Sequence, residues 1–424
     1  MIKLVILLIF YFAFPLLIIY LCRRWSLVAK LGTIVLAYGF GLVLGSSGIF
    51  PAGTEQYKMA LLGRAKLPAK EIEALVSEGK ITEQDVFVNR IATLQDTIIS
   101  VVVPLAFPLL LFSLNLRRWL RFARKGFISV ILALIAGIVM VTAGFFIWKN
   151  SIPESWKLAG MFEGIYTGGT PNFVAIKMAL DVDPNLFVIV STYDIVVGAF
   201  LVLFFITLAP RFFRLILPKY KDEGAVEMSE DEIRKETDEL EDYSGMFSKG
   251  RLLPLLVALG LSVLIVAIGL ALTFVFKGVP MMVVVILSIT TLGIIASLVP
   301  AINRIEKTFQ LGMYFILVFS LTIASMSDLK TMFGHGMFNL IMFISWCYFG
   351  SMLLHLLLAR IFRIDADNFL ITSAAYIFSP PFVPLVANAL KNKDLIVTGI
   401  TGGILGYVLG NYFGVALAYF LKGF

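Results

Sequence analysis

The sequence feature that most constrains the fold is an apolar stretch, residues 157–181, that a polar hexapeptide interrupts halfway. The interruption reads Thr-Gly-Gly-Thr-Pro-Asn over residues 167–172. At about 1.5 Å of rise per residue, the helical arms of residues 157–166 and 172–181 would each span about 15 Å, half of a hydrocarbon core of about 30 Å. Irregular backbone at that depth is tolerated only inside protein or beside a wet cavity. The stretch therefore predicts a binding site at the middle of a membrane.

The composition of the whole chain agrees with a membrane location. Of the 424 residues, 59% are hydrophobic and only 15% are charged, which is outside the range of a soluble domain. Several stretches of 18 or more apolar residues predict transmembrane helices. The first of them is followed by its basic residues rather than preceded by them, so we expect a retained span and no cleaved signal peptide. The fold class predicted is an all-α, polytopic membrane protein with 10–12 membrane segments.

The spans fall into two halves. We expect a first transmembrane repeat over residues 1–217, an acidic cytoplasmic linker over residues 218–250, and a second repeat over residues 251–424. A polar insertion at residues 47–96 is predicted to be a solvated excursion outside the cytoplasm. The expected spans are 3–22, 29–46, 97–114, 126–148 and 186–208 in the first half, and 252–276, 280–300, 308–326, 337–361 and 395–421 in the second.

The basic residues decide how the interrupted stretch meets the membrane. The net charge of +7 comes from short loops between spans, which the positive-inside rule explains without a nucleic-acid partner. A stretch that crossed completely would place the basic loops at residues 117–125 and 211–221 on opposite sides. A re-entrant hairpin places both in the cytoplasm. We therefore favour a hairpin, with the N-terminus outside and the protein in the cell (inner) membrane.

A second interrupted segment, residues 367–391, repeats the plan with the tip Phe-Ser-Pro-Pro at residues 378–381. In both tips a hydroxyl residue, Thr170 or Ser379, precedes proline, an arrangement typical of a helix N-cap. Five spans and one hairpin in each half make an odd number of crossings, so the halves are predicted to be inverted repeats. Paired discontinuous segments in inverted repeats are typical of secondary transporters.

The motif GIYTGGTPNFVAI at residues 164–176, followed by STYDIVVG at residues 191–198, resembles the membrane family called "domain of unknown function 819", or YjcL-like. That family is grouped with the cation:proton antiporter and anion transporter superfamily, which includes glutamate:sodium and citrate:sodium symporters. The resemblance covers nearly the whole chain. It implies an ion-coupled transporter of an anionic substrate and a homodimer. Relatives tend to carry Gly-Gly-Pro at the second tip, where this chain has Ser-Pro-Pro.

Asp194 is the leading candidate for the coupling-ion site. It lies within an apolar span beside Thr192, where an ionisable group costs about 3 kcal/mol and usually faces a cavity or a partner. It is predicted to bind Na⁺ or H⁺. The alternative is a structural ion pair with Lys177, which is also a possible partner for a carboxylate substrate. A third possibility is that Lys177 extends toward the surface near Asp181.

The two tips supply the other candidate binding residues. Hydroxyl, amide and backbone oxygens suit a hard cation, and glycines let the backbone approach a ligand. The second arm of the hairpin also points its N-terminal dipole at the membrane centre, which favours an anion. The alternative interpretation is a packing turn. The candidates are Thr167, Gly168, Gly169, Thr170 and Asn172 in the first tip, and Ser379 and Pro381 in the second.

Two further features receive structural interpretations. Glu163 lies one or two turns from the expected surface, so we expect its carboxylate to be solvated. Glycines at positions 402, 406, 410 and 414 form a stripe that lets another helix approach closely.

The function predicted is an ion-coupled secondary transporter of a small organic anion, with no enzymatic activity and no cofactor, and with Na⁺ as a candidate coupling ion. A Na⁺/H⁺-type exchanger is the first alternative, and an intramembrane enzyme, a sensor or a channel are others. The sequence has no HExxH and no Gly-x-x-x-x-Gly-Lys-Ser/Thr loop, so a zincin or an ATP-driven pump is not indicated. Two cysteines and two scattered histidines give no metal motif.

Overall fold

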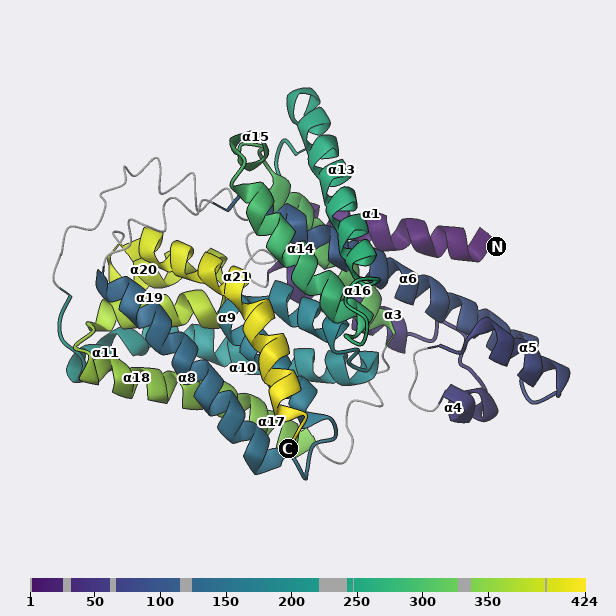
Figure 1. Ribbon diagram of the computed structural model, residues 1–424, viewed down its shortest axis with the longest axis horizontal. Coiled ribbons are helices and arrows are strands. Elements are labelled where there is room, and N and C mark those ends of the chain that lie inside the picture. Colours follow the sequence, from purple (N-terminus) through teal and green to yellow (C-terminus); the bar gives the residue numbers. More distant parts are fainter. Residues whose placement is uncertain are drawn as a thin grey trace. The chain divides into compact units, whose positions relative to one another are not determined.

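The computed structural model describes residues 2–25, 32–61, 66–114, 124–220, 242–246, 248–326, 337–392 and 395–424, and the statements below concern these residues. All of their regular elements are helices (Figure 1). Eight of these helices are long and apolar enough to cross a membrane, and α3 (Thr33–Ser46) and α14 (Met281–Ser297) are shorter apolar helices. The predicted all-α, polytopic class is confirmed.

The order of the elements repeats between the two halves of the chain. The first half has two apolar helices, a helical insertion, two more long helices, a broken helix and a last span. The second half has the same series without the insertion. The elements are α1 (Ile2–Arg24), α3, α4 (Glu55–Leu61), α5 (Ala69–Ser77), α6 (Glu83–Phe112), α8 (Arg124–Trp148), α9 (Ser155–Ala179), α10 (Pro184–Thr207) and α11 (Ala209–Ile216), then α13 (Lys249–Leu272), α14, α15 (Pro300–Asn303), α16 (Thr308–Ser325), α17 (Met337–Ser345), η2 (Trp346–Gly350), α18 (Ser351–Ile361), α19 (Ala366–Ile377), η3 (Pro380–Phe382), α20 (Val383–Leu390) and α21 (Ile396–Leu421). Most of the predicted acidic linker lies outside the described residues.

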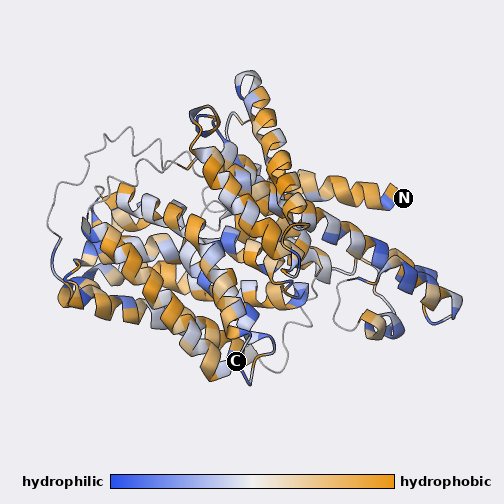
Figure 2. Cartoon of the chain, viewed as in Figure 1, coloured by the Kyte–Doolittle hydropathy of each residue, from blue (hydrophilic) through white to orange (hydrophobic). Residues whose placement is uncertain are grey.

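Several helices expose large apolar side chains, as a lipid environment requires. In α13, Leu253 is 69% exposed and Val257 is 59% exposed. Figure 2 shows hydrophobic residues over most of α13 and α1, whereas α5 in the insertion is largely hydrophilic. Exposed apolar surface of this extent is unfavourable in water but neutral against lipid tails, so these helices face the bilayer.

The chain forms two compact units. Unit 1 comprises residues 1–106, 182–192 and 312–334, and unit 2 comprises the remainder. In unit 1, the buried hydroxyl groups of Tyr11 and Ser325 lie 2.6 Å apart, and the amide of Gln95 donates to both. This group joins α1, α6 and α16. The polar insertion also belongs to unit 1 and has a small core of its own, formed by Tyr57, Leu67, Ile72 and Ile81.

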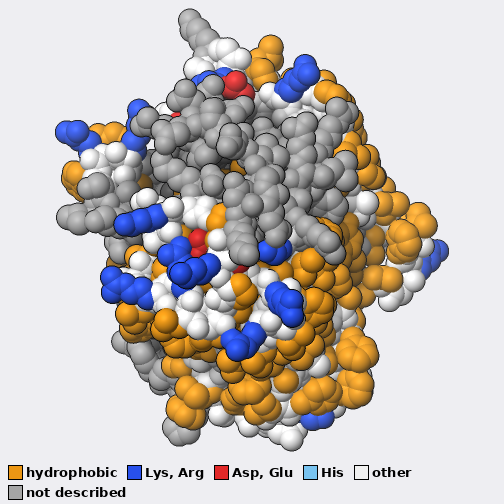
Figure 3. Space-filling view, turned by 90° about the vertical axis from the view of Figure 1, so that its left-hand side faces the viewer, with side chains coloured by type: hydrophobic (Ala, Val, Ile, Leu, Met, Phe, Trp, Pro, Cys, Tyr) orange, Lys and Arg blue, Asp and Glu red, His pale blue; other side chains and the backbone are white. Residues whose placement is uncertain are grey.

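Unit 2 has two chemically different ends. Side chains of tryptophan, tyrosine and lysine mark one of them, the aromatic end, where Trp148 lies 6.1 Å from Trp346 and Trp156 lies 6.0 Å from Tyr419. Such residues are typical of a membrane–water interface. Exposed arginines and lysines mark the other, the basic end, and Figure 3 shows Lys and Arg side chains on this face. The residues of the basic end are Arg211, Arg214, Lys219, Arg360, Arg363 and Lys391.

Helix α21 runs from the basic end to the aromatic end of unit 2, and its glycines form the seam on which both broken helices pack. A methyl group on Gly403 would contact Pro380, one on Gly406 would overlap the carbonyl oxygen of Thr167, and one on Gly414 would overlap Ile176. A methyl group on Gly410 would overlap the side chains of Asn172 and Thr167, so the predicted packing role of the stripe is correct for Gly406, Gly410 and Gly414. Figure 1 shows α21 beside α9, in agreement with their contacts.

We expect Gly406→Ala to lower the thermal transition temperature of the purified protein. The added methyl group has no room beside Thr167, and overpacking of this kind costs about 1–3 kcal/mol. The matched control is Gly260→Ala in α13, where nothing lies within 4 Å of the added group and alanine favours the helix. Intrinsic tryptophan fluorescence during heating measures both. Equal transition temperatures for the two variants would contradict the close packing of this seam.

Candidate functional site

The two arms of α9 fold back on each other. The backbone of Gly169 leaves the helical region, with φ 66° and ψ −158°. A methyl group on Gly164 in the first arm would overlap the side chain of Ile176 in the second, which a straight helix would hold far away. At the open end, the amine of Lys157 donates to the carbonyl oxygen of Asp181 at 3.0 Å. The interrupted stretch is thus a helical hairpin with its tip at Gly169.

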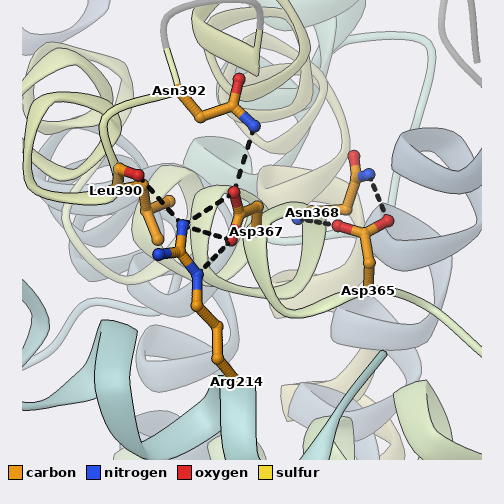
Figure 4. A network of polar contacts seen from close by, with 6 residues as sticks. All are labelled: Arg214, Asp365, Asp367, Asn368, Leu390 and Asn392. Carbon is orange, nitrogen blue, oxygen red and sulfur yellow. Dashed lines mark hydrogen bonds and ion pairs between the residues drawn. The ribbon is translucent and has the colours of Figure 1, made fainter. Parts of the chain in front are cut away.

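A second hairpin is formed by α19, η3 and α20, and polar contacts close its base (Figure 4). Arg214 of α11 binds both carboxylate oxygens of Asp367, at the start of α19, at 3.0 Å. The same guanidinium donates to the carbonyl oxygen of Leu390, at the end of α20, at 3.0 Å. Asn392 adds a hydrogen bond to Asp367 at 3.1 Å. One arginine therefore holds the first arm and the end of the second arm together.

The two hairpins share their backbone conformations at matching positions. Ser379 adopts φ 75° and ψ 164°, close to the values of Gly169. The second arms end at Asp181 and Lys391, which both have positive φ. The same number of residues separates Gly169 from Ser379 and Asp181 from Lys391. Tyr166 and Tyr376, each three positions before its tip, have this spacing as well. The hairpins are therefore copies of one motif, as the predicted repeat requires.

The tips of the two hairpins meet. A methyl group on Gly169 would overlap the hydroxyl oxygen of Ser379, so no side chain fits between them. Along α21, Gly399 packs against Val383 of the second hairpin, whereas Gly414 packs against Gly160 of the first. The hairpins consequently approach from opposite ends of α21, the first from the aromatic end and the second from the basic end.

Most polar groups of the first tip are used within the protein. The Thr167 hydroxyl donates to the carbonyl oxygen of Glu163 at 2.8 Å, and the Asn172 amide nitrogen donates to the carbonyl oxygen of Gly406 at 2.9 Å. The amide oxygen of Asn172 is buried and has no hydrogen-bond partner among the described residues. A methyl group on Gly168 would overlap the Asn172 side chain. Thr170 is half-buried.

The second tip differs from what its sequence predicts. Ser379 occupies the N-cap position of η3 and a proline follows in the first turn, as predicted, but the Ser379 side chain makes no capping hydrogen bond. Its positive φ directs the hydroxyl toward Gly169 and, in α21, toward Tyr407, with which it forms a hydrogen bond. The neighbouring Pro380 packs on Gly403. Pro381 lies in η3, next to the tip.

Asp194 has a specific partner in unit 2. The hydroxyl of Tyr348 donates to its carboxylate. Tyr348 lies in η2, a single π-helical turn between α17 and α18, and such turns occur frequently at functional sites. Lys177 is only 7% exposed, so the alternative in which it extends toward the surface does not hold. Thr192 falls in unit 1, where its hydroxyl donates to the carbonyl oxygen of Val188 in its own helix at 2.9 Å.

The environment of Glu163 differs from the one that its sequence position predicts. We expect a solvated carboxylate, but the side chain is 0% exposed. Neither carboxyl oxygen has a hydrogen-bond partner among the described residues. The expectation rests on the short distance, counted in helical turns, from Glu163 to the end of the arm. It is wrong because the second arm, α8 and α21 cover the sides of the first arm and exclude solvent there.

Sequence reasoning also missed the tyrosines around these acids. Tyr166 and Tyr376 are buried, with ring centroids 6.3 Å apart, and neither hydroxyl has a hydrogen-bond partner among the described residues. The signal that could have found them is their equal distance before the two tips. Within the described part of the chain, no three His, Cys, Asp or Glu side chains group as a metal site. The arrangement instead offers single buried acids and hydroxyl groups.

Comparison with known proteins agrees with the membrane class. The profile of a family described as "Protein of unknown function (DUF819)" matches residues 75–424. The chain is also 26% identical over 351 residues to the uncharacterized membrane protein YjcL of Bacillus subtilis (strain 168). That similarity covers 78% of this chain and 84% of YjcL.

We expect Ser379→Gly to raise the thermal transition temperature. Ser379 occupies a region of φ and ψ that is nearly restricted to glycine, and such strain costs about 1–3 kcal/mol. The matched control is Ser288→Gly inside α14, which lowers the transition because glycine disfavours a helix. A transition of Ser379→Gly at or below that of the parent would refute strain at this tip.

Proposed function

We propose that this chain, which belongs to the DUF819 family, is an ion-coupled secondary transporter of a small organic anion. The observation that carries the proposal is the meeting of two hairpin tips, Gly169 and Ser379, that approach from opposite ends of α21. Paired discontinuous helices of this kind form the substrate sites of several transporter folds. The proposal includes a place in the cation:proton antiporter and anion transporter superfamily, and it treats the chain as neither an enzyme nor a cofactor-dependent protein.

The polarity of the hairpins supports an anionic substrate. The second arms, which begin after Gly169 and at Val383, direct their N-terminal ends toward the meeting point of the tips. The N-terminus of a helix carries a partial positive charge of about half an electron charge. Two such ends near one point favour a carboxylate or a similar group. In this proposal the substrate lies against Gly168, Gly169, Thr170, Ser379 and Pro381, with the free amide oxygen of Asn172 as a further ligand.

Asp194 is proposed to bind the coupling ion, Na⁺ or H⁺. Asp194 is half-buried, and a carboxylate in an apolar span needs a positive partner or a proton, neither of which a single tyrosine hydroxyl supplies. Binding of the ion would remove the charge and stabilise one packing of the α10 and η2 segments. Thr167 is proposed to contribute through its backbone oxygen and Lys177 through its charge. Thr192 enters the proposal only through its position near Asp194 in the sequence.

The distribution of charge at the two ends of unit 2 supports an orientation. The exposed arginines and lysines in and just after α11 and α18, and just after α20, gather at the basic end, which we place in the cytoplasm by the positive-inside rule. The second hairpin then enters from the cytoplasm and the first from the outside, so each is re-entrant. The partners proposed are the lipid bilayer of the inner membrane, a small anion and a second copy of the chain.

The proposal predicts that Asp194→Asn abolishes ion-driven uptake. The protein in liposomes receives an inward Na⁺ gradient, then an inward proton gradient, with pooled radiolabelled organic anions outside. We expect accumulation in the parent and a loss of at least tenfold in Asp194→Asn, because the amide neither binds a proton nor carries a charge. Tyr348→Phe is the matched variant, since it removes only the hydroxyl that donates to Asp194, and we expect altered ion affinity with uptake retained.

The outcomes separate the alternatives. Uptake that Asp194→Asn leaves unchanged, together with its ion dependence, would remove Asp194 from the coupling site. Collapse of the gradient without solute uptake would identify an ion exchanger instead. No ion or solute flux under either gradient would overturn the transporter proposal and favour an enzyme or a sensor.

A further inference from the structure

A fully buried acid lies in unit 2, apart from the half-buried Asp194 and its partner Tyr348. Glu163 lies on the first arm of α9, a turn and a half before the tip at Gly169. Its side chain is 0% exposed, and both carboxyl oxygens lack a hydrogen-bond partner among the described residues. A group of this kind needs an explanation, because an unpaired buried charge is among the most unfavourable features of a folded protein.

Residues of α8, α19 and η2, together with one on its own arm, lie near the Glu163 carboxyl group. On α8, Gly137 lies so close that a methyl group there would be 3.2 Å from Oε2 of Glu163. The titratable groups near enough to interact electrostatically with its carboxyl group are Tyr166 on its own arm, Tyr376 on α19 and Cys347 on η2. None of these groups carries a positive charge. The carboxyl group is therefore enclosed by uncharged neighbours.

Only a proton fits this enclosure. A hard metal cation such as Na⁺ or Ca²⁺ requires several oxygen ligands at close range. Among the described residues, neither carboxyl oxygen of Glu163 has a hydrogen-bond partner. A proton requires no ligand shell and removes the charge by itself. The ionised form would have to recruit water, and the close packing against Gly137 leaves that face without space.

We propose that Glu163 is a proton-binding site of the transport cycle, separate from Asp194. This inference rests on the proposed transporter function and assigns a proton to one of its coupling ions. In the packing seen here, Glu163 holds the proton on its carboxyl group. When the hairpin separates from α8 and water enters, the proton passes from the carboxyl oxygen to water and a carboxylate remains. The packed state returns only after water on the accessible side supplies a proton.

The position of Glu163 links its charge to both the tip and Asp194. The carbonyl oxygen of Glu163 accepts the hydroxyl of Thr167, so a movement of one reaches the tip directly. Tyr348, which donates to Asp194, lies close enough to interact electrostatically with Tyr166 and Cys347, the neighbours of Glu163. A charge that appears at Glu163 therefore acts on both the substrate site and the Asp194 site.

Infrared difference spectroscopy of the purified full-length protein tests this proposal without any substrate. A protonated carboxyl group has a carbonyl stretch distinct from the bands of a carboxylate. We expect the parent to show this band at neutral pH, Glu163→Gln to lose it, and Glu163→Asp to restore it at a shifted frequency. The matched control is Glu154→Gln, at the start of the same helix, where the carboxylate binds Lys157 at 2.7 Å and is partly exposed. This control and Asp194→Asn should retain the Glu163 band.

The results decide between a proton site and the alternatives. Thermal unfolding of Glu163→Gln at neutral pH should match the parent within about 2 °C, because the amide keeps the shape of a neutral acid. A parent spectrum without the band, or a band that Asp194→Asn and the double variant with Glu163→Gln retain equally, would overturn the proposal. A band that Na⁺ removes at constant pH would identify a metal cation site instead. If liposomes show uptake but the protein lacks the Glu163 carboxyl band, only the proton site is refuted. If the band changes with pH but no uptake occurs, only the transport function is refuted.

Discussion

The structure depends on one constraint, that backbone polar groups inside a membrane must find partners within the protein. Both broken helices place unwound backbone at the middle of unit 2, where lipid offers no hydrogen bonds. The glycine seam of α21 meets this demand, because the absence of side chains lets the tips approach its backbone. The hydrogen bond from Asn172 to the carbonyl oxygen of Gly406 shows the result, a tip anchored on the main chain of its neighbour. Larger residues on the seam would hold the two hairpins apart from α21 and leave these groups without partners.

The pattern of apolar segments and breaks was sufficient to predict the class and the hairpins. Helix length and hydropathy are local properties, so most spans followed directly from the sequence. The exception is α6, which begins at Glu83, inside the predicted insertion. The tip at residues 167–172 was identifiable because Gly-Gly and Thr-Pro interrupt an apolar run. Its contact with Ser379 was not, because it depends on how two distant segments cross. The conformation of Ser379 was hidden for the same reason, since its φ is imposed by packing and not by its own preference.

Buried polar groups were predicted less well than the backbone. Asp194 stood out because a charge in a long apolar span is conspicuous. Glu163 lies in an arm about half as long as a transmembrane helix, and the sequence shows only its distance along the chain from the end of that arm. The structure places neighbours on all sides of that arm, which no one-dimensional measure contains. Tyr348 has an ordinary sequence context, and only the π-helical turn aligns it with Asp194.

The π-helical turn η2 has a consequence for the symmetry of the protein. Its counterpart in the first half, α8, is a regular helix. The acids Asp194 and Glu163 both belong to the first half, whereas the groups that face them from η2 belong to the second. The two hairpins have matching backbone conformations, but the acids and the groups that face them come from different halves of the chain. The polar side chains around the two tips are therefore not equivalent.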